Sequence, residues 1–145
     1  MTTIGGTVTS GFGAATENLK KQSPLIVKEF PEIENCFGGT INLELDKGLL
    51  VLASDHRTRP IDWHPDHSPG EVFDFLRVQV EPSSAGNLVS GWLYIAHNSD
   101  HRSNLKLHEV MAPRVEISVG ARCKIHIFRP CAELPYRQFP VVLVL

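Results

Sequence analysis

The chain has 145 residues, 42% hydrophobic and 21% charged, which predicts one globular domain, residues 1–145, with a sizeable core. A formal charge of −2 gives no general attraction for nucleic acid or an anionic membrane, so any phosphate binding must be local. Three cysteines without CxxC spacing suggest no disulfide framework, and no signal-peptide or transmembrane pattern is present. We expect a cytoplasmic protein without nucleic-acid or membrane partners.

The first expected elements are a strand and a helix. Residues 3–9 are rich in β-branched side chains and run into a glycine-punctuated segment, SGFG, at 10–13. From residue 16 to about residue 32 apolar side chains recur at helical spacing, and Ser23 before Pro24 is a candidate N-cap. This pattern predicts the only substantial helix, in one piece or two.

The rest of the chain is expected to be mostly strands. Short strands separated by turns, with a single helix after the first, favour a mainly β fold, a small closed or partly closed barrel, over a parallel sheet. Residues 55–70 contain three prolines and almost no periodicity, which predicts a long excursion that is either functional or a surface insertion. The further strands are expected at 40–45, 49–53, 72–80, 88–96, 105–111, 122–128 and 140–145.

Two glycine-punctuated segments carry the clearest candidate chemistry. The first is the SGFG segment, and the second is FGGTIN at 37–42. Each could be an ordinary turn or bend in which glycine adopts a positive φ. Thr40 and Asn42, however, are two residues apart in an expected strand, so their side chains share one face. A hydroxyl and an amide oxygen there could bind Mg²⁺ that takes its other ligands from nucleotide phosphates and water.

The order of these motifs resembles the archaeal CTP-dependent riboflavin kinases. Residues 6–13 are similar to the family pattern GxVxSGxG, and GTINL at 39–43 is similar to GTLNxxL. Further along, HEVMAP at 108–113 resembles the family segment E-I-I-A-P, and 119–125 lie where the family has a turn and a strand. The resemblance covers nearly the whole chain in the same order. It implies a six-stranded Greek-key barrel of the cradle-loop type, riboflavin kinase-like, with a short helical region after the first strand.

The resemblance also implies an activity and its site. The activity is transfer of the γ-phosphate of a nucleoside triphosphate, CTP in the family, to riboflavin, which gives FMN and requires Mg²⁺. Thr40 and Asn42 match the Mg²⁺-binding residues, Glu109 matches a flavin-contacting glutamate, and Ser99 is the nearest match to a flavin-contacting threonine. The resemblance assigns the nucleotide contacts to Ser10, Gly11, Phe12, Gly13, Ala14, Ala15, Thr16, Glu17 and Arg114.

The chain also departs from the family pattern. Ala14-Ala15 replace an acid and a glycine, and Cys36-Phe37 replace Pro-Tyr. After Ala112-Pro113 only Arg114 is basic. Phosphoryl transfer depends on positioning and on neutralising charge. These changes therefore count against CTP as the substrate more than against the expected fold. The alternative is a non-catalytic or differently acting barrel that binds a small ligand, flavin or nucleotide, and has lost the nucleotide loop.

Other side chains allow further hypotheses. The histidines of the excursion, His64 and His67, could join neighbouring His and Asp side chains in a transition-metal site, or they could be solvated loop residues. Trp63 could stack on a flat ring or anchor the excursion. Cys36 could be a reactive thiol or a packed one.

Overall fold

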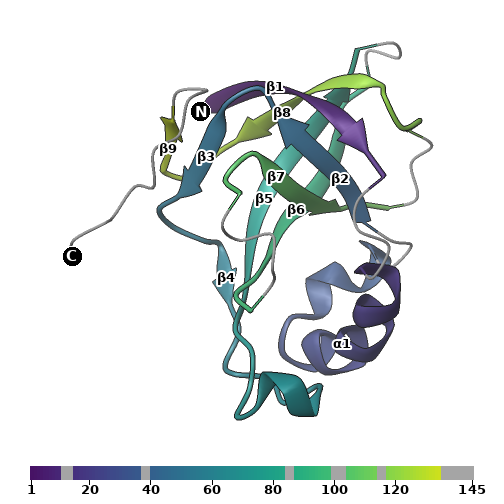
Figure 1. Cartoon of the computed structure of the whole chain (residues 1–145), viewed down its shortest axis with the longest axis vertical. Coiled ribbons are helices and arrows are strands. Elements are labelled where there is room, and N and C mark those ends of the chain that lie inside the picture. Colours follow the sequence, from purple (N-terminus) through teal and green to yellow (C-terminus); the bar gives the residue numbers. More distant parts are fainter. Residues whose placement is uncertain (11–14, 37–39, 84–86, 99–103, 114–116, 135–145) are drawn as a thin grey trace.

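A computed structural model of the chain describes residues 1–10, 15–36, 40–83, 87–98, 104–113 and 117–134, with the backbone alone for 15–17. Six antiparallel strands form a closed barrel, in which β1 pairs with both β2 and β8 (Figure 1). Around the barrel the order is β1, β2, β7, β6, β5, β8. These strands are β1 (Thr2–Thr9), β2 (Thr40–Leu45), β5 (Phe73–Pro82), β6 (Val89–Ala96), β7 (Leu107–Met111) and β8 (Arg122–Ile127).

The barrel contains a Greek key. Strands β5, β6 and β7 follow one another as antiparallel neighbours, and β8 returns to pair with β5 on its other side. Closure leaves no unpaired barrel edge, which removes the usual template for intermolecular strand pairing. The expected mainly β, six-stranded Greek-key barrel with one helix after the first strand is confirmed.

The interior of the barrel is one of two hydrophobic cores. Alternate residues of each strand point inward, as the period of two requires. On β2, for example, Leu43 and Leu45 are fully buried, while Glu44 between them is exposed. The principal interior side chains are Ile4, Val8, Leu43, Leu45, Leu49, Leu76, Val78, Val80, Leu93, Val110, Cys123, Ile125 and Ile127.

The second core lies between the outside of the barrel and the helix. The helix α1 (Ala15–Glu29) and the 3₁₀ segment η1 (Pro31–Cys36) cover aromatic side chains on the outer face of β5 and β6. Because this face is covered, Phe73, Phe75, Trp92 and Tyr94 can point away from the barrel interior and still be buried. The buried members are Leu19, Ile26, Phe30, Ile33, Cys36, Ile61, Phe73, Phe75, Trp92, Tyr94 and Met111.

The predicted cap of the helix is wrong. Pro24 lies inside α1, so Ser23 is not its N-cap. A proline in a helix removes one backbone hydrogen bond and crowds the preceding turn. The helix continues because Leu19 before the proline and Ile26 after it are both buried against the barrel. Burial of such side chains contributes about 1.5–3 kcal/mol each, enough to offset the loss.

Two short pairings went unnoticed in the sequence. Strand β3 (Gly48–Val51) pairs with β9 (Cys131–Leu134), and β4 (His56–Arg57) pairs with the beginning of β5. Neither β4 nor β9 has a strand-like pattern in isolation. The other strand boundaries differ from expectation by at most two residues, and the strand expected at 140–145 lies outside the described residues.

The excursion at 55–70 is anchored to the barrel. It contains β4, the 3₁₀ turn η2 (Pro65–His67) and a bridge between Ile61 and Glu71. The indole Nε1 of Trp63 donates to the Glu71 carboxylate at 2.8 Å, and Glu71 is only 2% exposed. Trp63 is therefore the anchor of the excursion. Among the described helices, none has both the length and the apolar character needed to cross a membrane.

Gly91 controls how closely β6 and β7 approach. A Cβ at this position would lie 2.6 Å from the backbone oxygen of Met111, which cannot move without disturbing the pairing. We expect Gly91→Ala to lower the free energy of unfolding by about 1–3 kcal/mol in urea denaturation. Ser90→Ala, the same side chain introduced at the exposed neighbouring position, is the control. Equal stability of the two variants would contradict the close approach.

Candidate functional site

Three chain segments that carry predicted nucleotide or metal contacts emerge at one end of the barrel. Strand β1 ends at Thr9, β2 begins at Thr40 and β7 ends at Met111. The registers pair Thr9 with Asn42 and Thr40 with Met111, so these three ends are neighbours. The segment that follows β1, the one that precedes β2 and the one that follows β7 therefore start from the same place.

A row of side chains crosses four strands on the outer face of the barrel. Thr9 is opposite Asn42, Asn42 is opposite Glu109, and Glu109 is opposite Tyr94. Directly paired residues of antiparallel strands project from the same face, with Cβ atoms about 5 Å apart. The row thus brings the predicted metal residue Asn42 and the predicted flavin residue Glu109 together. Thr40 lies two residues along β2 on the same face, as expected.

The remaining predicted residues are described only in part. Ser10 follows β1 and is exposed, and Ala15, Thr16 and Glu17 form the first turn of α1, where only their backbone is described. Asn98, which precedes Ser99, donates its backbone N–H to Glu71 at 2.7 Å. The positions outside the described residues are Gly11, Phe12, Gly13, Ala14, Ser99 and Arg114.

Glu109 is a partly buried carboxyl group that has no compensating partner in the part of the chain that the structure describes. No other described residue forms a hydrogen bond or an ion pair with it. Burial alone raises the pKa of Glu109 above its ordinary value. An acid that is desolvated and unpaired weakens the fold, so its position favours a role in binding over a structural one.

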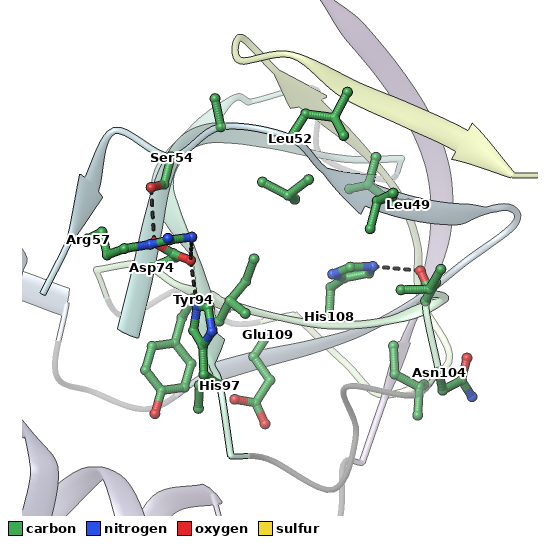
Figure 2. A pocket seen from close by; sticks show the side chains of 17 residues that line it. Leu49, Leu52, Ser54, Arg57, Asp74, Tyr94, His97, Asn104, His108 and Glu109 are labelled. Atoms are coloured by element: carbon green, nitrogen blue, oxygen red, sulfur yellow. Dashed lines mark hydrogen bonds and ion pairs between the residues drawn. The ribbon is translucent and has the colours of Figure 1, made fainter. Parts of the chain in front are cut away.

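Glu109 also lines a cavity of about 500 Å³ at the opposite end of β7 from Met111. Figure 2 shows Leu49 and Leu52 of the β3 segment along one wall, and His108 near the middle of the lining. Ile95 and Leu107 add further apolar surface. A volume of this size is within the range of small-molecule sites, which are mostly apolar with a few polar groups.

One end of the cavity carries a hydrogen-bonded cluster around Asp74. Arg57 binds both carboxylate oxygens, through Nε at 2.8 Å and Nη2 at 3.0 Å. Ser54 Oγ donates to Oδ1 at 3.0 Å, and His97 Nε2 lies 2.6 Å from Oδ2 (Figure 2). Burial by itself would raise the pKa of Asp74, but these hydrogen bonds outweigh it and lower the pKa. The cluster ties β4 and the end of β6 to the start of β5.

Thr40 and Asn42 fit a Mg²⁺ ion only together with a ligand. Both side chains are half-buried and offer neutral oxygens, with the Glu109 carboxyl beside Asn42. This donor set is too small to hold Mg²⁺ by itself, and it suits an ion that takes further oxygens from phosphate and water.

A transition-metal site at the histidines finds no support in the described part of the chain. There, no group of three or more His, Cys, Asp or Glu side chains is arranged to hold a metal ion. His64 Nδ1 instead accepts the Asp66 backbone N–H at 3.1 Å, and His67 stacks on Trp63 with ring centroids 4.7 Å apart. Cys36 is a packed thiol whose pKa is raised by burial, which disfavours the reactive thiolate.

No protein-family model matches the chain, and a search of curated proteins finds no match either. The geometry of the site is therefore the basis for the functional proposals below.

Apart from Glu109, the residues that line the cavity were not identified as site residues from the sequence. The one available signal was Asp74, because the alternation of β5 puts this acid on the inward face together with Leu76 and Val78. An inward acid on an apolar strand needs partners. Its partners come from segments far away in the sequence, so the pattern could not name them.

We expect Asp74→Asn to destabilise the protein in a pH-dependent way. The folded-state pKa of Asp74 is lowered, so its interactions stabilise the fold above the pKa of the unfolded chain and are lost as the pH falls through the folded pKa. The variant should lose about 2–3 kcal/mol of unfolding free energy at pH 7, and the difference should shrink below about pH 4. Urea denaturation from pH 7 to pH 2 measures it, with Asp62→Asn at an exposed position as the control. A difference independent of pH would refute this account.

Glu109→Gln should have the opposite effect. The folded-state pKa of Glu109 is raised, so stability falls as the pH rises between the unfolded and the folded pKa. The variant is therefore expected to be more stable than the wild type at pH 7, and to lose this advantage at about pH 3, where the acid is protonated in both states. Thermal denaturation at the two pH values provides the measurement. Glu44→Gln, an exposed position on β2, should show no such gain, and a less stable Glu109→Gln at pH 7 would contradict the prediction.

Proposed function

We propose that the protein is a riboflavin kinase-like phosphotransferase, which transfers the γ-phosphate of a nucleoside triphosphate to riboflavin in a Mg²⁺-dependent reaction. The observation that carries the proposal is the register of β1, β2 and β7. It brings Thr40, Asn42 and Glu109 to one face, beside the strand ends from which the predicted nucleotide segments start. The closed Greek-key barrel agrees with the fold that the resemblance implies.

The position of the cavity supports a flavin acceptor. The cavity borders Glu109, and Glu109 is directly opposite Asn42, about 5 Å away across the strands. Glu109 projects from the outer face with Asn42 and Thr40, whereas its neighbour His108, opposite Leu43, projects inward. A ligand that extends from the cavity to the face of Glu109 would bring its hydroxylated chain beside the proposed ion. The predicted nucleotide segments start at the Met111 end of β7 and the cavity lies at its other end, so the two substrates would meet beside Glu109.

The chain's own residues contribute positioning more than acid–base chemistry. Thr40 and Asn42 would hold Mg²⁺, which when bound neutralises charge on the phosphates. Glu109 would orient the acceptor. The attacking hydroxyl forms the new P–O bond, the bond to the nucleoside diphosphate breaks, and the hydroxyl proton passes to solvent or phosphate. A loose transition state makes little demand on a protein base.

The proposal predicts FMN formation by purified protein. Riboflavin, Mg²⁺ and each of the four nucleoside triphosphates are incubated with the protein, and FMN is measured by chromatography. Asn42→Ala should lower the rate at least about 100-fold with the active nucleotide, because the ion is no longer held. Glu44→Ala, an exposed change on the same strand face, should retain the wild-type rate.

Absence of FMN with every nucleotide would end the kinase proposal. If riboflavin or a nucleotide still binds under those conditions, the chain is the alternative, a small-ligand-binding barrel without transferase activity. Glu109, which is unpaired among the described residues, is compatible with both functions. The effect of Asn42→Ala on turnover is expected only for the kinase.

A further inference from the structure

His108 places an imidazole with a defined proton position in the cavity. Its Nε2 lies 2.7 Å from the backbone oxygen of Leu105, which can only accept a hydrogen bond. Nε2 must therefore carry a proton. Burial lowers the pKa of His108, although the hydrogen bond to Leu105 opposes this, so the ring is neutral near pH 7. A neutral ring with its proton on Nε2 has an unprotonated Nδ1, which is an acceptor.

This Nδ1 is open to the cavity. No other described residue forms a hydrogen bond with it. Among the described residues, the one fully buried side-chain nitrogen or oxygen without a hydrogen-bond partner is Nε2 of His56, so His108 Nδ1 is not sealed inside the protein. His108 lines the cavity, and Figure 2 shows its ring near the middle of the lining, with a dashed line for its hydrogen bond.

The ring of His108 is also held in a fixed orientation. The same Leu105 oxygen accepts the backbone N–H of Leu49 at 2.8 Å, which ties the start of β3 to the turn before β7. An acceptor fixed among apolar side chains prefers a ligand with a matching N–H or O–H donor, because an unmatched donor or acceptor loses its hydrogen bonds with water. The nearby walls are apolar, formed by Leu49, Leu52, Ile95 and Leu107.

We propose that the cavity binds a flat heteroaromatic ring whose N–H group donates to Nδ1 of His108, and that this contact selects the acceptor. The proposal deepens the proposed function and depends on it for the identity of the ligand. The isoalloxazine ring of riboflavin has a single N–H, at N3, on one edge of a flat and largely apolar ring system. That combination matches one fixed acceptor between apolar walls, and a cavity of about 500 Å³ has room for a ligand of this size.

The test compares two ligands, of which the second has a methyl group in place of the hydrogen at N3. Binding of riboflavin and of N3-methylriboflavin is measured by flavin fluorescence at pH 7.5 without nucleotide. The wild type should bind the methylated ligand about 5- to 150-fold more weakly, the loss expected when a buried hydrogen bond is left unmade. In His108→Leu, riboflavin should bind more weakly and the two ligands should differ less than about twofold. His126→Leu, the same change at a histidine outside the cavity, should keep the wild-type discrimination.

The outcomes separate the inference from the proposed function. Equal wild-type affinity for the two ligands, or discrimination that persists in His108→Leu, would overturn the role of His108. So would a wild type that binds neither riboflavin nor lumiflavin, which has the same ring with a methyl group in place of the ribityl chain. Discrimination in the wild type without FMN formation would sustain the cavity inference and refute the kinase. Because the first comparison changes only the ligand, equal affinity overturns the inference even if His108→Leu does not fold.

Discussion

The register between β2 and β7 is the constraint on which the rest of the site depends. It places Asn42 opposite Glu109 and Thr40 opposite Met111. A shift of one residue would turn Asn42 and Thr40 into the barrel interior and expose Leu43, at the cost of its buried surface. The hydrophobic core inside the barrel therefore fixes the polar row outside it. Packing of the core thus fixes the relative positions of the outer side chains.

The outer face of the barrel changes from aromatic and covered to polar from one side of the barrel to the other. On β5 and β6 this face is aromatic and covered by α1 and η1. Toward β7, β2 and β1 it becomes polar, with Glu109, Asn42 and Thr9 in successive strands. Tyr94 lies at the boundary, where its hydroxyl hydrogen-bonds with Gln22 of the helix. The helix thus stabilises the sheet immediately beside the candidate site.

Polar groups at the cavity fall into two classes. Asp74 is fully satisfied by Arg57, Ser54 and His97, which lower its pKa and join three segments. Glu109 has no such partner among the described residues, and its pKa is raised. A satisfied carboxylate stabilises the fold, whereas an unsatisfied one destabilises it and is typical of a binding residue. The contrast between these acids separates the hydrogen-bonded framework of the cavity from the carboxyl group that is proposed to contact a ligand.

The sequence by itself determined the barrel class, the helix after the first strand, and the shared face of Thr40 and Asn42, because these follow from local periodicity. It could not supply the β4 and β9 pairings, the continuation of α1 through Pro24, or the cavity with Asp74 and His108. Those features depend on segments brought together by barrel closure, such as β4 and β6 at Asp74, and local patterns carry no information about such partners. Only the tertiary structure decided which side chain stands opposite Asn42, since strand register is set by packing across the whole barrel.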